Sequence, residues 1–189
     1  MEPLAALDLA TSTFVDVLTQ VGDAQLGVPT PCEEWDVAAL VGHVTMGSEM
    51  AIALLDGASQ EEALAFRDRE FGGDDPVSAC RAAVAAQAVR LAAVTDWEET
   101  VHHPVGDVSA AQLLGFRTGD LTLHAWDLAT AIGADPGLPE DLAVVVYESM
   151  APMKPFIGQI GLFGEGPSGD VGDDADVQRR LLDLTGRRV

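Results

Sequence analysis

The sequence has little positive charge. Ten lysines and arginines stand against 31 aspartates and glutamates, and the formal net charge is -21 at pH 7. Such a chain repels phosphate backbones and anionic membrane surfaces, so we expect neither nucleic acid nor a membrane as a partner. A strong negative field favours cations, including metals, although most acidic surface residues serve only solubility.

Cysteines and long apolar runs are also scarce. The two cysteines, Cys32 and Cys80, are far apart in the sequence and are expected to be reduced thiols. The N-terminal segment has no basic start, and we find no window with the ~18 consecutive apolar residues that a membrane span requires. We therefore expect a cytoplasmic protein. No Gly-rich phosphate loop and no Ser-His-Asp arrangement is apparent.

The chain is long enough for one substantial core. It has 189 residues, 48% of them hydrophobic, and a domain of this size typically buries roughly 70% of its unfolded surface. We expect a single domain over residues 1–189.

Apolar residues recur at spacings of three and four, which is typical of amphipathic helices. The pattern predicts helices over residues 4–21, 37–55, 77–95, 110–132 and 138–157, with shorter helical segments at 59–70 and 177–186. Asp36 and Ser109 are the expected N-caps of the second and fourth long helices. We expect loops at 96–107, where a short strand could form, and at 161–176. The sequence thus predicts an all-α helix bundle with additional short helices.

Three side chains on two of these helices could hold a metal. Asp120 and His124 lie one turn apart on the same helical face, and His43 lies in the apolar stripe of another helix. An i,i+4 hydrogen bond and a satisfied core histidine explain the same residues one by one. Together, two histidines and a carboxylate would leave coordination positions open, as in catalytic zinc sites. The same ligands suit Fe(II), Ni or Mn.

Two blocks of the sequence resemble a known family. VPTPCEEWDVAALVGHV and GDLTLHAWDLATAIG are similar to the actinobacterial branch of the DinB/YfiT-like superfamily. This branch includes the N-terminal metal-binding domain of mycothiol-dependent maleylpyruvate isomerase. The likeness extends over nearly the whole chain, including the closing RLLDLTGRRV.

The resemblance implies a DinB-like four-helix bundle with a divalent metal held between helices. It assigns the metal ligands to His43, Asp120 and His124, with Asp120 in place of a glutamate that is one methylene longer. Zinc is the first expectation, with Ni, Fe or Mn as alternatives, and mycothiol is the implied co-substrate. We do not expect room for the isomerase's additional C-terminal domain. A homodimer is plausible by analogy with the superfamily.

Several neighbours of these ligands have two interpretations. Arg117 could bind a substrate carboxylate, or it could form an ion pair behind the metal or be a solvated side chain. For Asp127 we expect capping or solvent contact rather than a direct bond to His124. Trp35 and Trp126 are expected to be core anchors, and His102 and His103 to be surface residues. For both cysteines we expect packing rather than reactivity.

Three functions remain open. The first is a metal-dependent thiol transferase or isomerase, in which the metal activates a thiol that attacks a small electrophile. The second is a metal-binding stress or regulatory protein without catalysis. In the third, no metal binds and the histidines are core residues.

Overall fold

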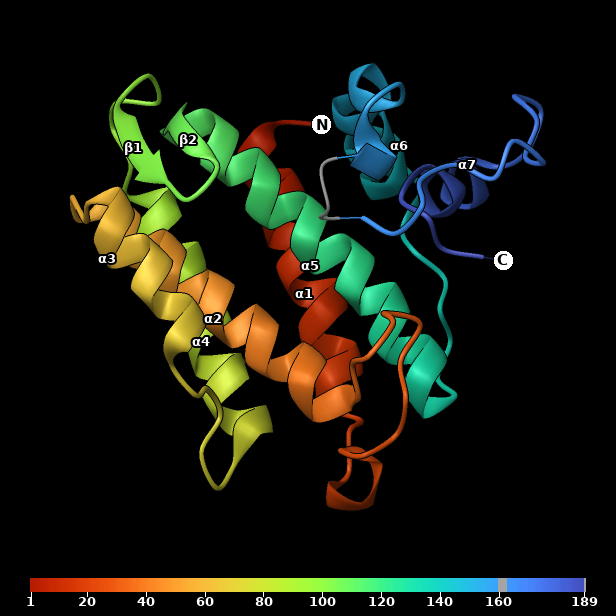
Figure 1. Cartoon of the computed structure of the whole chain (residues 1–189), viewed down its shortest axis with the longest axis horizontal. Helices are drawn as coiled ribbons and strands as arrows, with labels where there is room; N and C mark the ends of the chain where they lie inside the picture. Colours follow the sequence, from red (N-terminus) through yellow and green to blue (C-terminus); the bar gives the residue numbers. More distant parts are fainter. Residues whose placement is uncertain (160–162, 189) are drawn as a thin grey trace.

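Four long helices form the body of the protein in the computed structural model, which describes residues 1–159 and 163–188. They are α1 (Pro3–Leu18), α2 (Val37–Leu55), α4 (Pro76–Ala92) and α5 (Ala110–Ile132). Both α1 and α2 pack against α4 and α5, so the four helices close around one core (Figure 1). The predicted all-α four-helix bundle with additional short helices is confirmed.

Caps fix the ends of the two helices that carry the candidate ligands. The Asp36 side chain accepts a hydrogen bond of 2.8 Å from the Ala39 amide at the start of α2. Ser109 and Gln112 form a capping box at the start of α5, and Gly133 ends this helix in a left-handed conformation at φ 73°. Each cap satisfies backbone groups that a helix end would otherwise leave unpaired.

A β-hairpin connects α4 to α5. The antiparallel strands β1 (Thr100–His103) and β2 (Gly106–Ser109) pair from Thr100 with Ser109 to His103 with Gly106. Gly106 has a φ of 125°, which allows the tight turn. The sequence predicts a loop with at most one short strand here, and the second strand was missed. The hairpin contacts α2, α5 and the short helix α3 (Gln60–Leu64), which continues as a 3-10 turn, η2 (Ala65–Asp68).

The predicted helix at 138–157 is too long. The helix α6 (Glu140–Met150) ends at Met150, and 3-10 turns follow at η3 (Ala151–Met153) and η4 (Ile157–Gln159). Pro152 and Pro155 explain this early end, because proline lacks the amide proton that a helix interior requires. The predicted loop at 161–176 lies partly outside the described residues, and its described part forms turns and bends.

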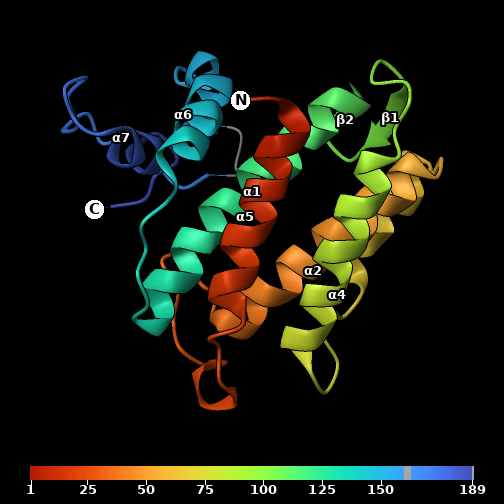
Figure 2. The same ribbon diagram turned by 180° about the vertical axis from the view of Figure 1, so that it is seen from behind.

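The C-terminal helix α7 (Val177–Leu184) matches its prediction. It packs against α6, and α6 lies against α1 and α5 at one side of the bundle (Figure 2). Because α7 packs against α6 and α6 lies against α5, the C-terminal segment ends close to α5. A short 3-10 turn, η1 (Asp23–Gln25), lies between α1 and α2.

Helix α2 is strongly apolar. By length and composition, Val37–Leu55 is apolar enough to cross a membrane, with a mean hydropathy of 1.5. Its apolar residues are interrupted by His43, Thr45, Ser48 and Glu49, so it meets this test on mean hydropathy without containing ~18 consecutive apolar residues. Half of that stretch is buried inside the bundle, and the core helix of a soluble protein passes the same test.

Candidate metal centre

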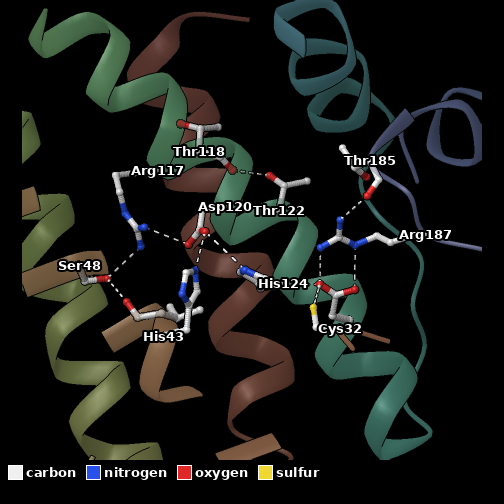
Figure 3. Close-up of polar contacts among 12 residues, drawn as sticks. Cys32, His43, Ser48, Arg117, Thr118, Asp120, Thr122, His124, Thr185 and Arg187 are labelled. Carbon is white, nitrogen blue, oxygen red and sulfur yellow. Dashed lines mark hydrogen bonds and ion pairs between the residues drawn. The ribbon is translucent and has the colours of Figure 1, made fainter. Parts of the chain in front are cut away.

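The three predicted ligands come together between two neighbouring helices. His43 projects from α2, and Asp120 and His124 project from α5 (Figure 3). Asp120 Oδ1 lies 3.1 Å from His43 Nε2 and 3.4 Å from His124 Nε2. The potential ligand atoms of the three side chains all lie within 4.8 Å of one another. The spacing on α5 and the apolar stripe on α2 thus identified side chains that meet in space.

The site is only partly buried. The side chains of His43 and Asp120 are 28% and 21% exposed, whereas that of His124 is 10% exposed. Trp35 lies beside both imidazoles, with ring-centroid distances of 4.7 Å to His43 and 5.9 Å to His124. His43, Asp120 and Trp35 are therefore all partly exposed to solvent.

A buried carboxylate orients His124 from behind. Asp127 Oδ2 lies 2.9 Å from His124 Nδ1, and the Asp127 side chain is fully buried. The expectation of capping or solvent contact for Asp127 is wrong, because the α5 helix places both side chains three residues apart on a face that is covered. Since a carboxylate can only accept, Nδ1 is the protonated nitrogen. This tautomer directs the other ring nitrogen, Nε2, at Asp120.

Arg187 from the C-terminal segment holds Asp127 in place. Its Nε donates to Asp127 Oδ1 at 2.8 Å and its Nη2 to Oδ2 at 2.6 Å, which is a bidentate pair. Burial tends to raise the pKa of Asp127, but the hydrogen bonds from His124 and Arg187 lower it to about 2. The carboxylate therefore stays ionised at every pH at which the protein would work.

Arg117 has an equivalent role behind Asp120. Its Nη1 lies 3.0 Å from Asp120 Oδ2, and its side chain is 7% exposed. Its Nε donates to Gln87 Oε1 at 2.6 Å and its Nη2 to Ser48 Oγ at 3.4 Å. Gly47 on α2 makes room for it, because a Cβ there would lie 2.9 Å from the guanidinium carbon. The geometry corresponds to an ion pair between Arg117 and Asp120, and substrate binding by Arg117 stays a prediction.

The electrostatics of the site favour a positive charge among the three predicted ligands. Burial tends to raise the pKa of Asp120, but Arg117 and the two imidazoles keep it well below its usual range. Burial likewise tends to lower the pKa of His124, but Asp120 and then Asp127 raise it well above its usual value. Ionised Asp120 therefore attracts either a proton or a metal cation to the space between the imidazoles.

Cys32 lies at the edge of the site. Its Sγ is 3.3 Å from Asp127 Oδ2, and its thiol, His124 and Asp127 form a second group with ligand atoms within 4.8 Å. Both oxygens of Asp127 already accept hydrogen bonds from Arg187, so this second group has no carboxylate oxygen without a partner. Cys32 thus donates a hydrogen bond to the polar contacts behind His124 and is half-buried.

The other singled-out residues lie elsewhere. His102 is exposed and pairs with Asp107 across the hairpin, and half-buried His103 lies beside Phe116. Trp126 and Cys80 belong to the core, as predicted, whereas Trp35 is only partly buried.

Three residues of the site were not predicted from the sequence: Gln87, Ser48 and Arg187. Gln87 had a usable signal, because it is a lone polar residue in the buried stripe of α4 formed by Cys80, Val84 and Leu91. Ser48 and Arg187 had none, since small hydroxyl residues are common inside helices and the segment after α7 has no periodicity.

Comparisons with known proteins point to one family. The model of the family described as the mycothiol maleylpyruvate isomerase N-terminal domain matches residues 7–129. Two uncharacterized proteins of Mycobacterium tuberculosis, from strains CDC 1551 / Oshkosh and ATCC 25618 / H37Rv, are each 33% identical over 84% of this chain and 81% of their own length.

Two solved structures share the fold. The crystal structure of the mycothiol-dependent maleylpyruvate isomerase superposes with a TM-score of 0.64 at 22% identity, over 86% of this chain and 72% of that one. A histidine-to-alanine mutant of the same enzyme gives a TM-score of 0.65 at 21% identity, over 80% of this chain and 68% of that one.

Proposed function

Because the chain belongs to the mycothiol maleylpyruvate isomerase N-terminal domain family, we propose that it is a metal-dependent thiol transferase or isomerase. It would hold a divalent metal, zinc in the first place, through His43, Asp120 and His124, and use mycothiol as its co-substrate. One observation carries the proposal: the ligand atoms of two imidazoles and one carboxylate from facing helices lie within 4.8 Å of one another.

These residues fit a divalent cation. Two imidazole nitrogens and a carboxylate oxygen are ligands that zinc accepts, and a three-ligand set leaves a position open for another molecule. In their unprotonated forms, the facing atoms of His43, Asp120 and His124 would repel one another. Asp120 Oδ2 is buried and makes no hydrogen bond within the described residues, although Arg117 lies at ion-pair distance from it. A shared cation would satisfy this arrangement.

The chemistry follows from such a cation and from its supports. A divalent metal lowers the pKa of a bound thiol, so that a thiolate is present near neutral pH. Asp127 keeps the lone pair of His124 Nε2 directed at the site, and Arg117 fixes Asp120. The thiol proton leaves to solvent. In a transfer, a carbon–sulfur bond then forms while the bond to the leaving group breaks, and the leaving group takes the electron pair.

The metal site can be tested without any activity. Protein purified without a His tag is analysed for metals, and a stoichiometric divalent ion is expected. His43→Ala should lose it, whereas His102→Ala, which changes an exposed histidine of the hairpin, should retain it. If the wild type holds no stoichiometric metal, or if His43→Ala retains the full amount, the proposed site is wrong.

A second experiment separates an enzyme from a binder. Mycothiol conjugation to a panel of small electrophiles is measured before chelation, after chelation, and after zinc is added back. We expect the rate to fall on chelation and to return with zinc. Equal rates in all three states would exclude metal-assisted catalysis, and bound metal without turnover would support the stress or regulatory protein instead.

We further propose that the protein acts in the cytoplasm without nucleic acid or membrane partners, and that it forms a homodimer. Fractionation of the native cell and light scattering of the purified chain test the location and the oligomeric state.

A further inference from the structure

We infer that Trp35 is a positioning residue of the candidate metal centre, and that its indole holds the His43 imidazole in the orientation that a shared cation requires. The inference rests on the proposed metal site and adds to it a residue that carries no ligand atom. It follows from the different supports of the two imidazoles, from the ring contacts of Trp35, and from the loop that carries Trp35.

The two imidazoles have different supports. His124 is 10% exposed, and Asp127 Oδ2 lies 2.9 Å from its Nδ1. The His43 side chain is 28% exposed, and Asp120 Oδ1, at 3.1 Å from Nε2, is its only polar partner in the part of the chain that the structure describes. A hydrogen bond at Nδ1 therefore fixes the tautomer and the ring plane of His124, and His43 has no equivalent bond to protein there.

The indole of Trp35 lies against His43 instead. The centroids of the two rings are 4.7 Å apart with their planes inclined by 40°, and His43 in turn meets the His124 ring edge-on at 5.0 Å. Trp35 also lies 5.9 Å from His124, so the three rings form one cluster. Aromatic pairs at such distances stabilise each other beyond the area that they bury. Because rotation of the His43 ring would disrupt this packing, Trp35 restricts the side chain to orientations near the observed one.

The contact follows from the place of Trp35 directly before α2. Asp36 is the N-cap of this helix, so Trp35 occupies the preceding position. An apolar side chain at that position often packs against the fourth residue of the helix, which is Leu40. His43 follows Leu40 by three residues and lies on the same helical face. The segment that caps α2 thus also places an aromatic ring beside a candidate ligand.

Hydrogen bonds and an unusual backbone conformation fix the loop that carries Trp35. The Trp35 carbonyl accepts from the Thr30 amide at 2.9 Å and from the Thr30 hydroxyl at 3.0 Å, and the Trp35 amide donates to the Cys32 carbonyl at 3.1 Å. Glu34 has a φ of 66° and is the one non-glycine residue with a positive φ among the described residues. Such a conformation costs free energy and persists only where its surroundings impose it. The loop therefore presents the indole in one fixed position.

The zinc affinity of Trp35 variants tests the inference. Dissociation constants are measured by competition with a chromophoric zinc chelator, without any substrate. Trp35→Ala should bind zinc about threefold to tenfold more weakly than the wild type, because His43 then adopts orientations that do not face the cation. Trp35→Phe keeps a flat ring and should recover most of the affinity. Trp97→Phe changes a partly buried tryptophan outside the site and should match the wild type.

Two further measurements separate positioning from a general effect on folding. Urea titration of the metal-free variants shows whether Trp35→Ala is fully folded where zinc binding is measured. In cobalt-substituted protein, the visible absorption of the ion should weaken in Trp35→Ala and return in Trp35→Phe, because the absorption reports coordination geometry. Wild-type zinc affinity in folded Trp35→Ala would overturn the inference, and so would an equal loss of affinity in Trp97→Phe.

A measurement on the metal-free protein keeps this inference separate from the proposed function. If the wild type binds no divalent metal, the proposed site fails, but NMR still decides whether Trp35 positions His43. We expect nuclear Overhauser contacts between the two rings and a single χ1 rotamer of His43 in the wild type, and averaging between rotamers in Trp35→Ala. A His43 side chain that keeps a single rotamer in Trp35→Ala would contradict the role of Trp35.

Discussion

At the scale of single residues, a buried ion pair ties the C-terminal segment to the candidate metal centre. Asp127 is fully buried, and Arg187 is its arginine partner, beside the imidazole of His124. Asp127 in turn orients His124, so Arg187 acts on the site through two side chains and is a positioning residue. The same contact therefore stabilises the fold and positions a side chain of the site.

Replacement of Arg187 should destabilise the protein strongly. Arg187→Met leaves the Asp127 carboxylate buried without its partner, and breaking a buried pair in this way costs about 3–5 kcal/mol. Arg188→Met is the matched control, because Arg188 is 53% exposed and lies 3.6 Å from exposed Glu165, with Asp183 at the longer distance of 3.8 Å. An exposed pair contributes about 1 kcal/mol or less. Urea titrations measure the free energy of unfolding of both variants. An equal decrease in the two would show that the buried Arg187 pair stabilises the protein no more than the exposed Arg188 pair.

The two cysteines should react at very different rates. Cys80 is fully buried, and burial raises the pKa of its thiol to about 11. At pH 8 about one thiol in a thousand is then ionised, and the thiolate fraction rises with pH up to about pH 11. Cys32 is partly exposed. With Ellman's reagent at pH 8, we expect native protein to release one thiol and denatured protein to release both. Fast labelling of native Cys32→Ser would show that Cys80 is accessible.

The residues that sequence could and could not predict differ in how they reach the site. His43, Asp120 and His124 lie on regular helices, so their spacing in the sequence predicts the helical face on which each one lies. The family resemblance predicted that these two helices lie next to each other. Asp127 was misjudged because its surroundings depend on the segment after α7, which covers that face of α5. Arg187 reaches the site through irregular backbone, for which sequence offers no periodicity.

At the scale of elements, α2 and α5 together position the candidate ligands. Their starts were predictable because Asp36, Ser109 and Gln112 are local capping signals. The end of α6 was equally local, since Pro152 and Pro155 forbid the predicted extension, but the apolar pattern was given too much weight there. Strand β2 was missed because a four-residue strand has too little alternation to be recognised.

Close packing of α2 against Arg117 should make Gly47 sensitive to substitution. Alanine is normally favoured over glycine inside a helix by about 1 kcal/mol. In Gly47→Ala, however, the new methyl group overlaps the guanidinium, which three partners hold in place. We expect a net loss of about 1–3 kcal/mol, together with weaker metal binding as Asp120 loses its support.

Gly115→Ala on α5 is the control, because nothing lies within 4 Å of a Cβ there. This variant should be as stable as the wild type or more stable. Urea titration and metal titration of both variants check the pair of predictions. A stabilised Gly47→Ala with unchanged metal affinity would mean that Arg117 moves aside without cost.

At the scale of the whole molecule, repulsion between acidic surface residues opposes the stabilisation that the helix bundle gains from its apolar core. The helices gather one large apolar core, while a net charge of -21 is spread over the surface. Two of the few cationic side chains, Arg117 and Arg187, are buried beside Asp120 and Asp127, so they do not offset the negative charge of the surface. Most surface carboxylates thus repel one another, and this repulsion is weaker in the expanded unfolded chain.

Salt should therefore stabilise the protein. The Debye length shrinks from roughly 30 Å at 0.01 M salt to about 8 Å at 0.15 M, so added salt screens repulsion between surface carboxylates first. The buried pairs of Arg117 and Arg187 are screened much less. We expect Tm to rise by a few degrees over this range in the presence of a chelator, which removes the effect of divalent ions. Sodium, potassium and tetramethylammonium chloride should act alike if screening is the cause. A Tm that is constant, or that rises with only one of the three cations, would show that specific ion binding or the buried pairs govern the response.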